Sequence, residues 1–284
     1  MPFLLIVSLV WAFSFGLIKR HLGGVDSSVV AGVRVALALL VLLPFLRPRT
    51  IAASAAARLA VVGALQFGVM YLAYIAAFES LGAYEIAVLT ILTPFWVCLF
   101  DDVLSRRFTG RACLAAAIAV AGTAVIIVTK GFDAGSAKGV ALVQASNACF
   151  ALGQVLYRRW RAISMTAVRD RDVFAWLFAG AVLVTLPFAA PRAGETLAAL
   201  TSMQWAVLAY LGVLASGICF FLWNVGATRV SAATLSVMNN LKVPLAVACS
   251  LLFFGEAAEL WRLLAGGALI AVALWIAREQ KVAA

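Results

Sequence analysis

Charged side chains are scarce in this sequence, and acidic ones are the scarcest. Charged residues make up 12% of the 284 residues and hydrophobic residues 65%, with a mean hydropathy of +1.07. Soluble domains average about 45–50% apolar and about 25% charged residues, so one aqueous core could not bury this much apolar surface. Long polar segments are missing too: the longest expected linker, 158–172, leaves no room for an inserted soluble domain.

Groups typical of active sites are also few. The single histidine, His21, lies at the end of an apolar run, and the five cysteines fall inside apolar runs without the spacing of metal ligands. Asp101 and Asp102 are adjacent, but no nearby histidine or glycine-rich phosphate loop accompanies them. We therefore expect no catalytic residue, no metal site and no cofactor. An intramembrane enzyme is the less favoured alternative.

Long apolar runs follow one another along the whole chain. A run of about 18 or more apolar residues is typical of a transmembrane helix, whereas the alternating strands of a membrane barrel are absent from the sequence. We predict an all-α polytopic membrane protein with ten transmembrane helices. The expected spans are 3–20, 28–46, 58–79, 84–103, 110–129, 137–157, 173–190, 203–227, 231–254 and 260–278.

Basic residues gather in the short loops on one side of these spans. If the N-terminus is cytoplasmic, the inner side holds fourteen Lys and Arg residues and the outer side six. The positive-inside rule then favours both termini in the cytoplasm of a bacterial-type inner membrane. We interpret the net charge of +10 as a topology signal, not as nucleic-acid binding, although a basic inner face also permits contact with the lipid bilayer.

The two halves of the chain resemble each other. LTILTPFWVCLF (89–100) matches NNLKVPLAVACS (239–250), with Pro94 opposite Pro244. Each half has five spans, an odd number, so the second half must insert upside down. The loop after span four is basic and the loop after span nine is acidic, as an inverted repeat requires. The predicted five-helix repeats of this one membrane domain are residues 1–130 and 131–284.

The motif NNLKVP places polar residues in the middle of span nine. Lys242 lies near the midplane, where insertion of a lysine costs about 2.5–3.5 kcal/mol, and Asn239 shares its helical face. Pro244 has no N–H, so the carbonyl of Asn240 needs another partner. Inverted-repeat transporters bind substrate near the midplane, so we interpret these residues as one wall of a wet cavity. The alternative is a lysine that pairs internally, beside a proline that only shapes the helix.

Other spans carry polar or aromatic residues at their centres, although membrane helices also use amides simply to hold one another. Arg34, about a third of the way into span two, is interpreted as structural or gating, together with Pro94 and Pro244. The residues that we expect to contact substrate are Lys242, Asn239, Asn240, Trp11, Asn147, Trp223, Asn224, Tyr74 and Gln66.

Acidic residues are absent from the centres of the expected spans. All twelve lie at span ends or in loops. Proton-coupled pumps often carry a buried carboxylate relay, so a facilitator or exchanger is at least as well supported here. A cavity whose deep charges are all basic favours a carboxylate-bearing substrate over a lipophilic cation.

Motifs spread over almost the whole chain carry a family resemblance. They are LVWAFSF in span one, AGVRVALALL in span two and VPLAVACSLLFFGE, with Gly255 and Glu256, in span nine. With ten spans in two inverted halves, the chain resembles the drug/metabolite transporter (DMT) superfamily, specifically its EamA-type members. WNVG at 223–226 is similar to the YddG-type amino-acid exporters, whereas DDVLSRR replaces the Gly-Glu expected after span four. The resemblance implies a basket of spans one to four and six to nine around a central cavity, with spans five and ten outside.

These observations together predict a secondary transporter. We expect it to export small zwitterionic metabolites, amino acids first, by alternating access, and to act as a monomer or weak homodimer. Within transport, the runner-up is a multidrug or nucleotide-sugar type carrier. A non-transporting scaffold or receptor would not need a buried lysine.

Overall fold

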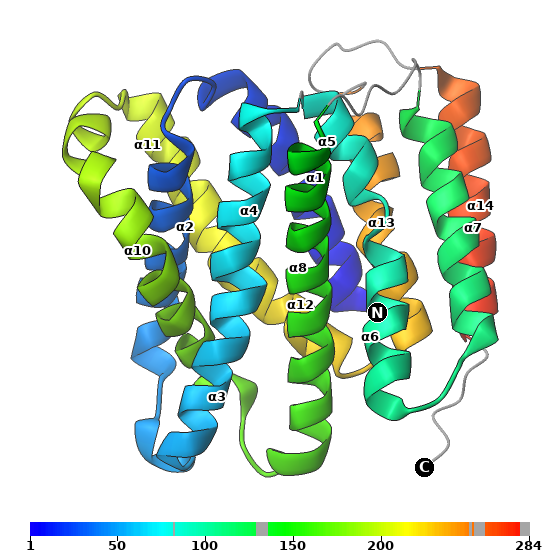
Figure 1. Ribbon diagram of the computed structural model, residues 1–284, viewed down its shortest axis with the longest axis horizontal. Coiled ribbons are helices and arrows are strands. Elements are labelled where there is room, and N and C mark those ends of the chain that lie inside the picture. Colours follow the sequence, from blue (N-terminus) through cyan, green and yellow to red (C-terminus); the bar gives the residue numbers. More distant parts are fainter. Residues whose placement is uncertain (82, 129–135, 250–251, 253–258, 279–284) are drawn as a thin grey trace.

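The computed structural model describes residues 1–81, 83–128, 136–249, 252 and 259–278, and in them the chain is one bundle of helices (Figure 1). The helices are α1 (Pro2–His21), α2 (Ser27–Leu42), α3 (Ala53–Gly63), α4 (Met70–Ala76), α5 (Ala83–Thr90), α6 (Thr93–Ser105), α7 (Gly110–Ile127), α8 (Ala137–Ser164), α9 (Asp170–Val173), α10 (Ala175–Ala198), α11 (Ser202–Ala209), α12 (Cys219–Ala227), α13 (Ala232–Cys249) and α14 (Leu260–Arg278).

The ten predicted spans are found in order. Nine helices of the described part are long and apolar enough to cross a membrane, and Pro2–Ser14 adds a shorter apolar segment. The prediction of an all-helical polytopic membrane protein is thus confirmed. The predicted boundary between the repeats, at 130/131, lies outside the described residues, as do Gly255 and Glu256.

Two helices continue beyond the predicted span ends at 157 and 190. The helix of span six continues to Ser164 and that of span seven to Ala198, several residues beyond the apolar runs. Hydropathy registers only the part of a helix that lies in hydrocarbon. The backbone continues past it because the polar residues beyond, such as Arg161, find partners: its Nε pairs with Asp170 Oδ1 at 2.7 Å. The linker between these spans is correspondingly shorter.

Spans three and eight each contain a widened, π-helical segment. In span three the segment is Ala64–Val69, between α3 and α4, and in span eight it is Tyr210–Ile218, between α11 and α12. π-Helical turns are rare and occur mostly at functional sites. Here they fall at equivalent positions in the two halves and carry Gln66 and Ser216.

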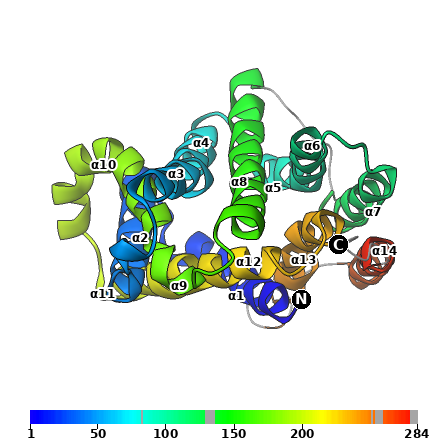
Figure 2. The same cartoon turned by 90° about the horizontal axis from the view of Figure 1, so that it is seen from below.

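The helices of spans five and ten, α7 and α14, pack together at one edge of the bundle (Figure 2). A Cβ atom on Gly266 would lie 2.3 Å from the carbonyl oxygen of Gly122, so the two backbones touch where only glycine fits. Small residues permit such close approach between membrane helices. The contact places spans five and ten together at the edge of the bundle, in agreement with the outside position that the resemblance implies for them.

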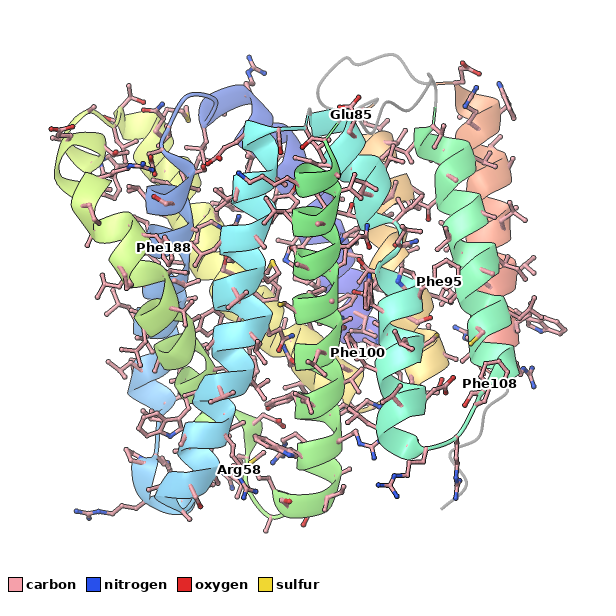
Figure 3. The ribbon with its side chains drawn as sticks, in the orientation of Figure 1. Arg58, Glu85, Phe95, Phe100, Phe108 and Phe188 are labelled. Carbon is pink, nitrogen blue, oxygen red and sulfur yellow. The ribbon has the colours of Figure 1, made fainter. Side chains whose placement is uncertain are left out.

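The arginine-rich loops lie together at one end of the bundle, which we call the basic end. Arg58 lies at this end and Glu85 at the opposite one (Figure 3). At the basic end, Arg158 Nη1 of α8 pairs with Asp101 Oδ1 of α6 at 3.1 Å, which ties the second half of the chain to the first.

Candidate substrate site

The helix of span nine, α13, changes its surroundings halfway along. The nine residues from Ala232 to Asn240 are buried, whereas each of the nine from Leu241 to Cys249 is partly exposed. The change falls inside NNLKVP, and the helix continues unbroken through Pro244. Lys242 therefore lies where α13 leaves the packed core.

Lys242 faces an aromatic ring instead of an acid. Its Nζ lies 5.8 Å from the centroid of the Trp11 ring, within the range of a cation–π contact. Among the described residues, no acceptor forms a hydrogen bond or ion pair with this ammonium group. The indole N–H of Trp11 donates to the carbonyl of Ala215 at 2.8 Å, which fixes the ring. The alternative of an internally paired lysine thus finds no partner in the described part of the chain.

The buried amides pair with one another between helices. Gln66 Nε2 donates to Asn224 Oδ1 at 3.3 Å, which joins the π-segment of the first half to α12 of the second. Trp223 Nε1 donates to Gln154 Oε1 at 2.9 Å, and Gln154 Nε2 lies 3.4 Å from Asn239 Oδ1. All five side chains are buried. Four of them, all except Gln154, are residues that we expect to contact substrate, and that contact therefore requires a conformation other than this one.

Span four breaks just before Pro94, which lies in the first turn of its second helix, α6. The chain leaves α5 at Thr90 and enters α6 at Thr93. Asn240 Nδ2 of α13 donates to the carbonyl of Ile91 at 2.9 Å, and Asn147 Nδ2 of α8 donates to that of Leu89 at 3.0 Å. Carbonyls released by a broken membrane helix need such partners. In this structure both asparagines therefore stabilise the broken backbone of span four.

The two remaining predicted residues lie apart from the amide pairs. Tyr74 is partly buried and packs against a small apolar cluster with Ala77 and Leu89. Arg34 extends its guanidinium over the Tyr71 ring, 4.7 Å from the centroid, and Nε donates to Ser216 Oγ at 3.2 Å.

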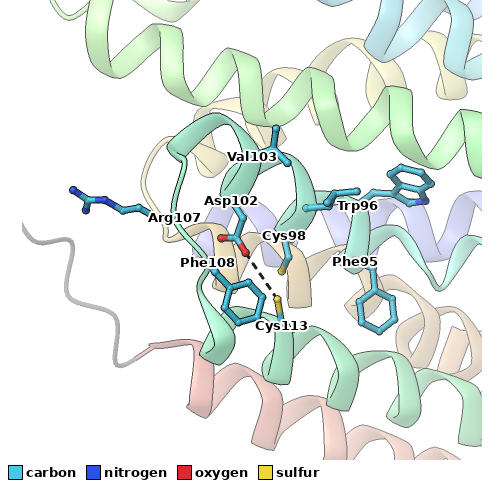
Figure 4. A pocket seen from close by; sticks show the side chains of 9 residues that line it. Phe95, Trp96, Cys98, Asp102, Val103, Arg107, Phe108 and Cys113 are labelled. Atoms are coloured by element: carbon cyan, nitrogen blue, oxygen red, sulfur yellow. Dashed lines mark hydrogen bonds between the residues drawn. The ribbon is translucent and has the colours of Figure 1, made fainter.

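Two pockets of the described structure contain none of the predicted site residues. The pocket in Figure 4 is a crevice of about 620 Å³ between α6 and α7. It is lined by Phe95, Trp96, Cys98, Leu99, Asp102, Val103, Arg107, Phe108 and Cys113. The other, of about 650 Å³, lies between α2, α4 and α10 and includes Glu79 and Arg192. The first opens beside the exposed side chains of Phe95 and Leu99, which in a membrane face lipid.

Phe220 is a residue that the sequence reasoning missed. It is buried at the centre of an aromatic group, with ring centroids 5.0 Å from Trp11 and 4.6 Å from Phe67. Its position three residues before Trp223, on the same helical face, is the sequence feature that could have identified it. Tyr71 and Ser216, which hold Arg34, were missed because no periodicity marks a contact between distant spans.

Comparison with known proteins identifies the class. The model of the EamA-like transporter family matches residues 1–128 and 137–278, one stretch in each half. The chain belongs to this family of membrane transporters, and the resemblance drawn from its motifs is confirmed.

Named relatives are similar over nearly their full length. The chain is 43% identical to a "Probable biotin transporter" of Pseudomonas aeruginosa, over 98% of this chain and 97% of that protein. It is 37% identical to proteins named "Biotin transporter" in Salmonella typhimurium and in Escherichia coli (strain K12), over 98% of this chain and 93% of each. A solved crystal structure shares the fold, with a TM-score of 0.78, 19% identity, and coverage of 99% of this chain and 98% of that one.

Proposed function

We propose that the protein carries a small carboxylate-bearing metabolite across the cytoplasmic membrane, and that biotin is its substrate. The observation that carries this proposal is Lys242. It is a lysine near the middle of α13, partly exposed, held over Trp11 and without an acid partner among the described residues. A lysine in this position costs several kcal/mol, and a substrate carboxylate would offset that cost during transport.

The names of the relatives favour biotin over the amino acids expected from the sequence. Biotin ends in a carboxylate on a short alkyl chain, which matches a single ammonium beside an aromatic surface. An amino acid also needs an acceptor for its own ammonium group. The described acidic residues lie towards the ends of the spans, as Glu85 does (Figure 3), so the surroundings of Lys242 suit the monocarboxylate better.

Alternating access would expose this site to each side in turn. The contacts between halves, such as Arg158 with Asp101 at the basic end, are those that would open and close. The loop charges support a cytoplasmic location for the basic end and for both termini. We retain a monomer or weak homodimer as part of the proposal, and a facilitator or exchanger remains at least as well supported as a proton-coupled pump.

The test is counterflow of labelled biotin in proteoliposomes that contain the purified full-length protein. Vesicles loaded with unlabelled biotin should accumulate label above protein-free vesicles, and vesicles loaded with alanine, leucine or phenylalanine should not. Exchange of amino acids without exchange of biotin would restore the amino-acid hypothesis. If none of these compounds exchanges, the proposed substrate class is wrong.

A further inference from the structure

Arg34 is a second deep cation that the proposed site does not use. It is the eighth residue of α2 (Ser27–Leu42) and is partly exposed. Like lysine, an arginine far inside a membrane span is costly and occurs where it meets a polar partner or lines a watery cavity. In the described part of the chain, no carboxylate pairs with Arg34.

The guanidinium of Arg34 is oriented but not saturated. Its Nε donates to Ser216 Oγ at 3.2 Å, and its plane lies over Tyr71, with Cζ 4.7 Å from the ring centroid. The Tyr71 hydroxyl lies 3.5 Å from the same Ser216 oxygen. The terminal nitrogens Nη1 and Nη2 have no hydrogen bond to any described residue. A fixed guanidinium therefore presents its two terminal NH2 groups to a ligand, in the fork that suits a planar acceptor.

Arg34 bonds directly to the π-segment of span eight, and Lys242 is linked to the same segment only through Trp11. Trp11, which faces Lys242, donates to the carbonyl of Ala215, and Arg34 donates to the hydroxyl of Ser216. Both acceptors lie in the π-segment of span eight. Arg34 comes from the first half of the chain and Lys242 from the second, so the two halves bring their cations towards the same segment.

The chemistry around the two cations differs. Beside Arg34 are two hydroxyls, Tyr71 and Ser216, which can accept as well as donate. Beside Lys242 is the Trp11 ring, whose N–H is already committed to Ala215. The Arg34 group thus offers donors and acceptors together, whereas the Lys242 group offers positive charge and an apolar face.

We propose that Arg34, with Tyr71 and Ser216, binds the end of the substrate opposite its carboxylate, through a planar carbonyl flanked by N–H groups. The ureido ring of biotin has this pattern: its oxygen accepts from the Arg34 nitrogens and its N–H groups donate to the hydroxyls. The inference rests on the proposed function and extends it. The substrate is read at two ends, and Arg34 determines specificity for the ring.

The experiment measures how well two analogues compete with labelled biotin in counterflow. Lipoate keeps a carboxylate but has no ureido group, and the primary amide of biotin keeps the ureido ring but has no carboxylate. In Arg34→Gln, the preference for biotin over lipoate should fall by about 10–100-fold, the effect of losing hydrogen bonds to a charged group, while the preference for biotin over its amide stays. In Lys242→Met the preference for biotin over its amide should fall, while the preference for biotin over lipoate stays.

Tyr71→Phe and Ser216→Ala each remove one hydroxyl beside Arg34. Each should lower the preference for biotin over lipoate by several-fold, less than Arg34→Gln does. Arg192→Gln is the control, because that arginine is exposed and pairs with Asp26 at the end of the bundle. Equal loss for biotin, lipoate and the amide in all three Arg34-group variants would show a merely structural role and overturn the inference. Absence of biotin exchange by the unmodified protein would instead overturn the proposed function.

Discussion

Spans four and nine occupy equivalent places in the two halves and carry the same proline, yet they fold differently. Span four breaks at residues 91–92 and restarts at Thr93, one residue before Pro94, whereas α13 passes through Pro244 as one helix. The broken span carries no charge at its centre, and the continuous one carries Lys242. Proline alone therefore does not decide where a membrane helix breaks.

The difference lies in what the rest of the bundle supplies. The carbonyls of Leu89 and Ile91 at the break accept from Asn147 and Asn240, and the carbonyl of Thr90 accepts from the Thr93 hydroxyl at 2.7 Å. Three polar side chains thus stabilise the open backbone of span four. One of them comes from α13 itself, so the charged span supports the broken one.

The largest expected effect comes from exchanging the two equivalent central residues. Lys242→Leu should lower the transport efficiency for biotin by about 10–100-fold, because a charge-assisted contact with the carboxylate is lost. Adding Leu92→Lys should not restore it, because that lysine would sit in the broken span, away from Trp11. Counterflow kinetics of the single and double variants measure this. Lys138→Ala, at an exposed helix end, is the matched control. Recovery of biotin transport in the double variant would show that the two central positions are interchangeable and would contradict this prediction.

The second effect is a loss of protein stability when the break in span four loses a hydrogen-bond donor. Asn240→Ala should destabilise the protein by about 1–3 kcal/mol, because the buried carbonyl of Ile91 is left without its donor. Thermal unfolding in detergent measures the change. Thr90→Val, which removes a hydroxyl bonded only to its own helix turn at Ala87, should cost less. An equal loss in both variants would argue against a special role for Asn240.

The third effect separates the two prolines. Pro244→Ala supplies the missing N–H inside a continuous helix and should stabilise the protein by about 1 kcal/mol, the net contribution of one added hydrogen bond. Pro94→Ala should change stability by less, because Pro94 lies in the first turn of α6, where proline is well tolerated. Paired unfolding curves test this order. Stabilisation by Pro94→Ala and not by Pro244→Ala would contradict the expected difference between the two prolines.

The smallest effect is a pH dependence at the start of α2. Burial alone would raise the pKa of Asp26, but the Ser28 hydroxyl, the Val29 N–H and Arg192 outweigh it and hold that pKa below its ordinary value. The contribution of this cap is therefore present above about pH 4 and is lost as the pH falls through the lowered pKa. In the second half, α11 is capped by Thr201, which does not titrate.

Hydrogen exchange should show the first turn of α2 loosening below pH 4 while that of α11 stays protected. Asp26→Asn should make the two turns behave alike across this range. Loosening of both turns together in the unmodified protein would point to a general acid effect.

The sequence predicted the spans because each one is long and apolar by itself. It also identified Lys242 and the amides as polar groups at the centres of apolar spans. It did not predict the break in span four or the unbroken helix at Pro244, because both depend on donors from other spans. The stacking of Arg34 on Tyr71 is likewise a tertiary contact without a local signal.

We propose that Lys242 acts on the substrate carboxylate and not on the stability of the fold. Isothermal titration of biotin into purified Lys242→Met tests it most directly, with the melting temperature measured on the same sample. We predict a melting temperature equal to or above that of the unmodified protein and an affinity at least about 10-fold weaker. Unchanged affinity in a folded Lys242→Met protein would contradict the account.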